Sequence, residues 1–207
     1  MNMFKLLFTS LFLCGSLSAQ HIGISFSKTW TDNYELENPN GFSINISQVF
    51  IDDIEVQFEY SKFENRREFF GHLISGFLPV PPSPQDIREN VQSESRLQVY
   101  DLSIKYFVLQ LDELSIAFGG GLSLNKMDGR RVGTESGRAV PLFDEDSFGI
   151  SGILYLESRA LRALPVTLYL TIQKKQISSG NQATDIETPF SSSLDTWVLQ
   201  TGIKFKF

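Results

Sequence analysis

Trp197-Val198-Leu199-Gln200-Thr201-Gly202-Ile203-Lys204-Phe205-Lys206-Phe207 ends the chain and has the two-residue periodicity of a β-strand. One face of this strand carries Trp197, Leu199, Thr201, Ile203, Phe205 and Phe207, and the other carries Val198, Gln200, Gly202, Lys204 and Lys206. An apolar face with aromatic residues at both ends, opposite a face with two lysines, suits a position between lipid and a polar interior. The stretch therefore predicts a strand in the wall of a membrane β-barrel.

The last six residues, 202–207, also resemble the assembly signal of bacterial outer-membrane β-barrel proteins, an alternating strand that ends in phenylalanine. The resemblance implies that Ile203, Phe205 and Phe207 are read by the barrel-insertion machinery. It covers the final strand by motif and the rest of the chain by pattern, which is similar to that of small OmpA- and OmpX-like barrels. A secreted, soluble β-sandwich is the alternative, and it predicts a protein that leaves cells without detergent.

The first 19 residues have the features of a cleaved secretory signal peptide. Lys5 supplies the positive charge, residues 6–14 supply a short apolar core, and residues 16–19 are small residues at a cleavage region. A lipid anchor on Cys14 is disfavoured because Leu13 precedes it, where lipoprotein processing needs a small side chain. Residues 20–207 are then expected to form one domain without cysteine, which excludes disulfide and thiolate chemistry.

The charge balance and the hydropathy of the chain exclude two further classes of protein. Without Lys5, 17 basic and 24 acidic residues give a net charge of −7, which argues against a nucleic-acid partner. No run of 18 or more apolar residues follows the signal peptide, so no spanning helix is expected. A barrel strand shows only every second residue to lipid, so a low mean hydropathy is compatible with a membrane protein.

Alternation of period two recurs along the chain and predicts eight strands of about ten residues. The connections alternate in length, with short turns at 51–53, 111–113 and 158–165 and long loops at 31–40, 63–95, 126–147 and 178–193. This rhythm predicts an all-β fold: an eight-stranded antiparallel up-and-down transmembrane β-barrel. Its short turns and both termini are expected in the periplasm and its four long loops outside the cell, in the outer membrane of a Gram-negative bacterium.

Aromatic residues are expected to form two girdles at the two lipid interfaces. Lys62 and Lys174 lie on the same outward face just beyond the upper girdle, where they reach headgroup phosphates. The upper girdle is predicted to contain Trp30, Phe42, Tyr60, Tyr100, Phe148 and Trp197, and the lower one Phe50, Tyr106 and Phe207.

The inward faces of the predicted strands carry equal numbers of acids and bases. Eight strands enclose a lumen that side chains fill, and an unpaired charge there is costly, so we expect a paired, closed polar plug. A gated ion or solute path is the functional alternative. The predicted lumen network consists of Glu55, Glu59, Asp101, Lys105, Glu157, Lys175, Lys204 and Lys206, with Glu55–Lys105 and Glu157–Lys204 or Glu157–Lys206 as the expected pairs.

Catalytic and metal-binding patterns are weak in this sequence, and neither an enzyme nor a cofactor is predicted. His72 and Ser75 are the best candidates for ester hydrolysis, but no carboxylate accompanies them to orient the histidine. Residues 144–146 are Asp-Glu-Asp, yet they lack the spaced oxygen ligands and the glycine of a calcium loop, so an acidic surface loop is favoured over a metal site.

The segment 63–95 is too apolar for an idle solvent loop, because it contains two apolar runs at 69–74 and 77–82. It is expected to fold over the barrel mouth as a lid, to lie on the outer leaflet or to dock a partner protein. Arginines at 66, 67, 130, 131 and 138 make lipopolysaccharide phosphates a candidate ligand, and pairing with acids such as Glu64, Glu68 and Asp128 is the alternative. The hypothesis is a surface-interaction or envelope-structural barrel; a component of a secretion or assembly complex has the same wall pattern.

Deletion of Phe207 tests the assembly signal. The chain expressed with its signal peptide should enter the outer-membrane fraction and migrate differently in detergent gels before and after heating. Without Phe207, the heat-modifiable band should decrease or appear more slowly because the last strand is read less well. A detergent-free periplasmic product with no heat shift would contradict the barrel.

Overall fold

A computed structural model describes residues 20–31, 38–51, 53–74, 85–159, 165–178 and 193–206. The predicted signal peptide and Phe207 lie outside these ranges and remain predictions. Within these ranges, no helix has the length and apolar character needed to cross a bilayer. The strands are β1 (Gln20–Thr31), β2 (Asn40–Ile51), β3 (Ile54–His72), β4 (Arg88–Gln110), β5 (Leu114–Gly133), β6 (Ala139–Ser158), β7 (Val166–Ser178) and β8 (Ser193–Lys206).

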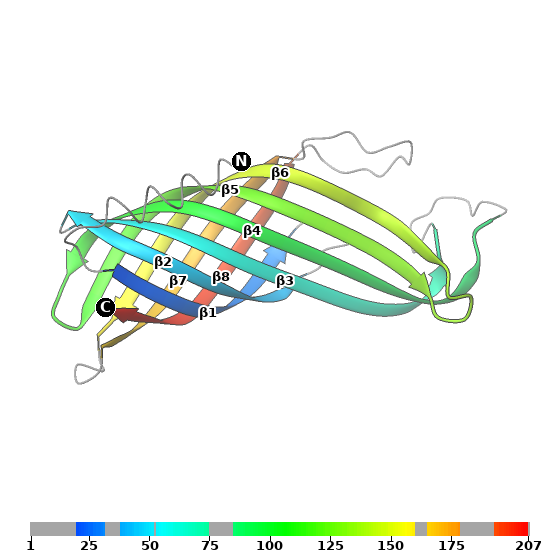
Figure 1. The fold of residues 1–207 in the computed structure, drawn as a ribbon, viewed down its shortest axis with the longest axis horizontal. Coiled ribbons are helices and arrows are strands. Elements are labelled where there is room, and N and C mark those ends of the chain that lie inside the picture. The colour runs from blue at the N-terminus through cyan, green and yellow to red at the C-terminus, as the bar shows by residue number, and fades with distance from the viewer. Residues whose placement is uncertain are drawn as a thin grey trace.

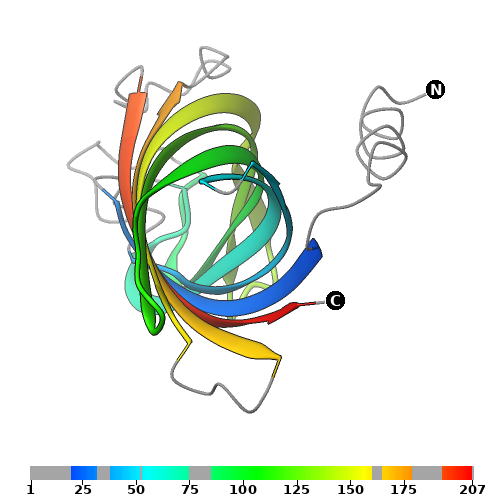
Figure 2. The same cartoon turned by 90° about the vertical axis from the view of Figure 1, so that its left-hand side faces the viewer.

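The eight strands form a closed ring in which each strand pairs with its neighbours in sequence and β8 pairs antiparallel with β1 (Figure 2). The predicted eight-stranded up-and-down barrel is therefore confirmed. Because β8 is the partner of β1, Trp197 lies opposite Trp30 and Ile203 opposite Ile24. Closure gives both edge strands a hydrogen-bonded neighbour, which an open sheet in lipid would lack.

The ring closes with an offset that tilts the strands. A line drawn through directly opposed residues starts at Gln20 and, after one circuit, returns to β1 at Trp30, ten residues further along the strand. The line runs through Gln20, Gln48, Val56, Ile104, Gly120, Gly152, Lys174 and Trp197. An offset of this size in eight strands corresponds to the usual tilt of about 35–45° and an interior that side chains fill.

The alternation predicted from the sequence separates the two faces of the wall. Outward side chains such as Phe26, Ile150 and Leu122 are more than half exposed. Inward side chains such as Ser27 and Gln173 are buried, and most of the inward residues are polar. This arrangement inverts that of a soluble protein, because the outside is apolar and the interior is polar, and it identifies the exterior as the surface that faces lipid.

The strands differ from the predicted length of about ten residues, and the long loops are correspondingly shorter. β3 to β6 have 19 to 23 residues, whereas β1, β2, β7 and β8 have 12 to 14. Much of the predicted loops 63–95 and 126–147 is therefore strand. Beyond the aromatic residues, β3 to β6 continue as a four-stranded wall that extends past the other strands (Figure 1). We call this part the projecting sheet; it comprises residues 63–72, 88–97, 127–133 and 139–146.

Two glycines of the wall give a matched test of close strand packing. A Cβ atom at Gly119 would lie 2.3 Å from the Ile104 carbonyl oxygen, whereas one at Gly152 would have no atom within 4 Å. We expect Gly119→Ala to lower the urea midpoint of the folded, heat-modifiable form because the neighbouring backbone must move. Gly152→Ala should leave the midpoint unchanged. Equal effects of the two substitutions would contradict this packing.

Candidate functional site: the lumen and the projecting sheet

At the short-turn end of the lumen, Glu55 lies between two lysines. Its Oε1 atom is 2.9 Å from Lys105 Nζ and its Oε2 atom is 2.7 Å from Lys204 Nζ. All three side chains are only 1% exposed. The two ammonium groups also approach the Tyr155 ring, at 3.9 Å and 5.1 Å from its centroid. One carboxylate and one aromatic face therefore hold two buried positive charges.

Glu157 completes this cluster on the β6 side. Its Oε2 atom accepts a hydrogen bond from the Tyr155 hydroxyl at 2.9 Å and lies 3.4 Å from Lys204 Nζ, while its Oε1 atom lies 3.3 Å from Arg159 Nε. Lys206, the other predicted partner of Glu157, is exposed at the end of β8 and lies outside the cluster of buried charges. The alternation places it on the inward face, but the strand ends before the wall encloses its side chain.

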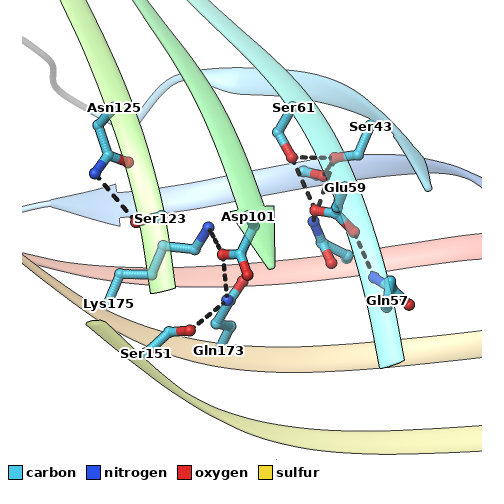
Figure 3. Close-up of polar contacts among 12 residues, drawn as sticks. Ser43, Gln57, Glu59, Ser61, Asp101, Ser123, Asn125, Ser151, Gln173 and Lys175 are labelled. Atoms are coloured by element: carbon cyan, nitrogen blue, oxygen red, sulfur yellow. Dashed lines mark hydrogen bonds and ion pairs between the residues drawn. The ribbon is translucent and has the colours of Figure 1, made fainter. Parts of the chain in front are cut away.

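Asp101 forms a second charged group further from the turns (Figure 3). Its Oδ2 atom accepts hydrogen bonds from Lys175 Nζ at 2.8 Å and from Gln173 Nε2 at 3.0 Å. Gln173 also donates to the Ser151 hydroxyl at 2.9 Å. The pair Asp101–Lys175 links β4 to β7 across the interior, a partnership that alternation along single strands does not reveal.

Glu59 on β3 is directly opposed to Asp101 of β4 and is held by neutral donors (Figure 3). The described donors are Gln57 Nε2 at 3.0 Å, the Ser61 hydroxyl at 2.8 Å and Gln200 Nε2 at 2.5 Å. The Ser43 hydroxyl links the donors, because it lies 2.8 Å from the Ser61 hydroxyl and accepts from Gln200 Nε2 at 3.2 Å. Glutamine and serine residues on β3 and β8, which sequence reasoning left out of the network, thus satisfy this buried carboxylate.

Two apolar clusters occupy the lumen beside the charged groups. The cluster on the turn side stacks Tyr155 on Tyr169, with ring centroids 5.7 Å apart, and sets Phe107 edge-on to Tyr155. The other lies where the lumen meets the projecting sheet, and Phe63, Leu97 and Met127 of that sheet belong to it. It consists of Phe63, Leu97, Val99, Met127, Ile177 and Val198. Together with the polar groups, these side chains fill the interior as expected for eight strands.

The residues assigned to the aromatic girdles lie on the outer surface where they are described. Tyr60 and Tyr100 are directly opposed, with ring centroids 5.2 Å apart, and Trp30 is opposed to Trp197. Phe42 and Phe148 are 47% and 74% exposed on the same side, and Phe50 and Tyr106 are 50% and 53% exposed near the short turns. Their exposure in two zones fits two interfaces with lipid headgroups.

Outside the lipid-facing zone, ion pairs between strands hold the projecting sheet together. Glu64 on β3 lies 2.7 Å from Lys62 Nζ and 3.0 Å from Arg96 Nε of β4. Glu94 on β4 lies 2.7 Å from Arg130 Nη2 of β5, and this guanidinium lowers the pKa of the Glu94 carboxyl below its usual range. Opposite charges on neighbouring strands stabilise the pairing of these strands.

The tip of the projecting sheet is fixed by the carboxylate of Glu89. It accepts hydrogen bonds at 2.8 Å from the backbone N–H groups of Glu135 and Ser136 and also bonds the Ser136 hydroxyl, which lowers the pKa of the Glu89 carboxyl. Thr134 adds two hydrogen bonds to the Asn90 carbonyl, through its backbone N–H and its hydroxyl, both 2.8 Å long. The β5–β6 hairpin is thereby locked onto β4.

The arginines considered for phosphate binding contact the chain itself. Arg131 is 3% exposed and donates from Nη1 to the Ile74 carbonyl at 2.7 Å, while Arg138 donates to the Gln85 carbonyl at 3.2 Å. Arg66 bonds the Gln92 side chain at 2.5 Å, and Arg67 also takes part in an interaction. These side chains serve first to order the projecting sheet.

The structure places a carboxylate beside His72, which the sequence did not indicate, and adds no support for a metal site. His72 Nδ1 lies 3.6 Å from the Asp86 carboxylate, and Asp86 accepts the Ile74 N–H at 2.8 Å; Ser75 lies outside the described residues. The described ranges contain no group of three or more His, Cys, Asp or Glu side chains placed to hold a metal ion. Residues 144–146 belong to β6 rather than to a loop.

Solved structures that are similar to this chain include outer-membrane proteins. Neisserial surface protein A is 15% identical and matches 92% of this chain and 97% of its own, with a TM-score of 0.54. OprG from Pseudomonas aeruginosa is 10% identical over 93% and 97% of the two chains, and a major outer membrane protein from Thermus thermophilus is 9% identical over 91% and 99%, each with a TM-score of 0.54. No family model matches the chain, and no curated protein is detectably related in sequence.

At these identities the likeness establishes the fold, which is that of small outer-membrane β-barrels. The apolar exterior between two aromatic zones is the surface that such a fold presents to lipid. The resemblance predicted from the last strand is thus confirmed at the level of the fold. The outer membrane of a Gram-negative bacterium is the location to which this fold and this surface belong.

Removing the carboxylate of Glu55 tests the buried cluster. Glu55→Gln leaves two ammonium groups in the lumen without a carboxylate between them, so we expect a loss of about 3–5 kcal/mol in the free energy of unfolding. Lys206→Gln, at an exposed position, should cost less than about 0.5 kcal/mol. Urea titration of the heat-modifiable band measures both. Equal stabilities of the two variants would show that the cluster contributes nothing.

Proposed function

We propose that this protein is a non-enzymatic outer-membrane barrel with a closed, charge-paired lumen that acts through its projecting sheet in surface interaction or envelope structure. The observation that carries the proposal is the contrast between the lumen and the projecting sheet. The lumen is filled by ion pairs and apolar clusters, whereas the projecting sheet exposes charged side chains on ordered strands. A barrel with a filled lumen is suited to support the projecting sheet rather than to conduct a solute.

The projecting sheet has the properties of a binding surface. Its strands continue those of the barrel, and cross-strand ion pairs and the Glu89 contacts fix its tip, so a partner meets a pre-organised surface and little ordering cost is incurred on binding. Segments that a rigid scaffold holds out toward solvent are where binding residues are commonly found. An envelope or extracellular protein is one partner class that we propose for it.

Three further partners complete the proposal. Outer-membrane lipid surrounds the apolar exterior, and lipopolysaccharide is a ligand for cationic side chains at the outer interface. The barrel-insertion machinery is proposed to read the last strand through Ile203, Phe205 and Phe207. The signal peptide of residues 1–19 delivers the chain to that machinery and is absent from the mature domain, residues 20–207.

A second candidate function is the passage or sensing of a small solute or ion through the lumen. It is favoured by buried polar atoms without a described partner, among them Asp101 Oδ1, Asn125 Oδ1 and the Ser147 hydroxyl. Such atoms are satisfied by water in most proteins. Passage would also require the apolar cluster around Phe63 and Val99 to move aside, and for this reason we favour the closed lumen.

Planar-bilayer recording separates the two functions. The purified, heat-modifiable barrel should give no discrete single-channel steps, because side chains close the lumen. Val99→Ala and Val198→Ala remove bulk from the apolar cluster without adding charge and serve as a control for leakage. Reproducible steps in the unmodified protein, altered by Asp101→Asn, would overturn the closed lumen and favour solute passage.

A further inference from the structure

The outer faces of β3, β4 and β5 bring together a row of polar side chains next to the aromatic girdle. Lys62 is directly opposed to Gln98, and Gln98 is directly opposed to Lys126, so the three outward side chains form one row across three strands. Adjacent strands lie about 4.8 Å apart, which separates the two lysine backbones by roughly 10 Å. The row thus has a cation at each end and a neutral amide in its centre.

An aromatic and apolar surface lies directly below this row, on the side of the membrane. Tyr60 and Tyr100 occupy the next outward positions, with ring centroids 5.2 Å apart. The following row consists of Phe58, Leu102 and Leu122, of which Leu122 is 65% exposed. A molecule bound to the polar row can therefore place a ring against the tyrosines and alkyl chains along the wall.

Above the row, further from lipid, lie Glu64, Arg96 and Asp128. Glu64 contacts both Lys62 and Arg96, so one carboxylate serves two cations. Lys126 is exposed, and Asp146 of β6 is the acid opposed to it. The two lysines thus occupy the row nearest the lipid headgroups on these three strands. The backbones of Glu64 and Asp128 lie about 7 Å further out, two residues along their strands. Because the Glu64 carboxylate reaches back to Lys62 Nζ at 2.7 Å, a phosphate bound to Lys62 competes with it.

We propose that this surface of β3–β5 binds an outer-leaflet glycolipid whose head group is a disaccharide with a phosphate at each end, as in lipid A. Lys62 and Lys126 receive the two phosphates, Gln98 hydrogen-bonds the sugars between them, and Tyr60 and Tyr100 support the sugar rings. Two separated cations match two separated phosphates, whereas a phospholipid with a single phosphate reaches only one of the lysines. The inference rests on the proposed outer-membrane location and names the lipopolysaccharide site within it.

Another lysine at the same level gives a matched control. Lys174 on β7 lies 5.7 Å from the Trp197 ring and 3.7 Å from the Asp195 carboxylate. Its directly opposed neighbours are Gly152 and Trp197, so no second lysine accompanies it in its row. Lys174→Gln removes one cation from the outer interface without altering the proposed site.

Native mass spectrometry of the full-length, heat-modifiable barrel in detergent, titrated with purified diphosphoryl lipid A, tests the site. We expect binding of one lipid A molecule, and a loss in affinity of about tenfold or more in the double variant Lys62→Gln/Lys126→Gln. Lys62→Arg/Lys126→Arg and Lys174→Gln should retain the affinity. Monophosphoryl lipid A and phosphatidylglycerol should bind the unmodified protein more weakly than diphosphoryl lipid A.

Three results would overturn the inference: unchanged affinity of the double glutamine variant, an equal loss in Lys174→Gln, or equal binding of phosphatidylglycerol, which would mean unspecific attraction of anionic lipid. Gel migration before and after heating verifies that each variant is folded. Failure to fractionate with the outer membrane would overturn the proposed function itself. A correctly located and folded barrel without selective lipid A binding would overturn the glycolipid site alone.

Discussion

The pairing of β8 with β1 is the constraint on which this structure depends. In hydrocarbon, each unpaired backbone N–H or C=O group costs several kcal/mol, so a sheet in lipid must have no free edge. The last strand therefore has to meet the first along its length, and the register from His21–Lys206 to Thr31–Thr196 achieves this. The offset of ten residues around the ring sets the strand tilt and with it the width of the lumen.

That width leads to the arrangement of charges inside. A lumen of this size contains little water, so its acids and bases must find partners on whichever strands face them across the interior. Glu55 joins β3 to β4 and β8, and Asp101 joins β4 to β7. Glu59 obtains its hydrogen bonds from neutral side chains of β3 and β8. The polar interior thereby connects strands that are not neighbours in the wall.

The projecting sheet is stabilised by different interactions from the rest of the wall because it lies outside lipid. Its outward rows alternate in charge between strands, as in Glu64–Arg96 and Glu94–Arg130, and these ion pairs take the place of an apolar belt. The long strands β3 to β6 form one half of the barrel wall, and the shorter strands β1, β2, β7 and β8 form the other half. The outer surface is therefore asymmetric (Figure 1). The proposed glycolipid site lies at the boundary between the projecting sheet and the lipid-facing wall, below the ion pairs and above the apolar rows. Selective binding there would orient this asymmetric surface relative to its lipid neighbours.

The sequence by itself determined the number of strands, their alternation, the closed eight-stranded class and the side of the wall on which the side chains of the predicted strands lie. Period two is a property of the chain alone, so it needs no knowledge of neighbours. It also identified Glu55 and Lys105 as partners, because both lie on the inward faces of neighbouring strands near the turn side. The segments 63–72 and 127–133 were expected to belong to long loops, and they are strands that pair with β4.

Only the tertiary structure decided which charges meet across the lumen, such as Asp101 with Lys175, and that Lys206 remains exposed. It also decided that Lys62, Gln98 and Lys126 share one row. These contacts depend on the register of every strand pair and on the offset with which the ring closes. That offset is a property of the whole barrel, because it accumulates over eight pairings, and no local pattern of residues records it.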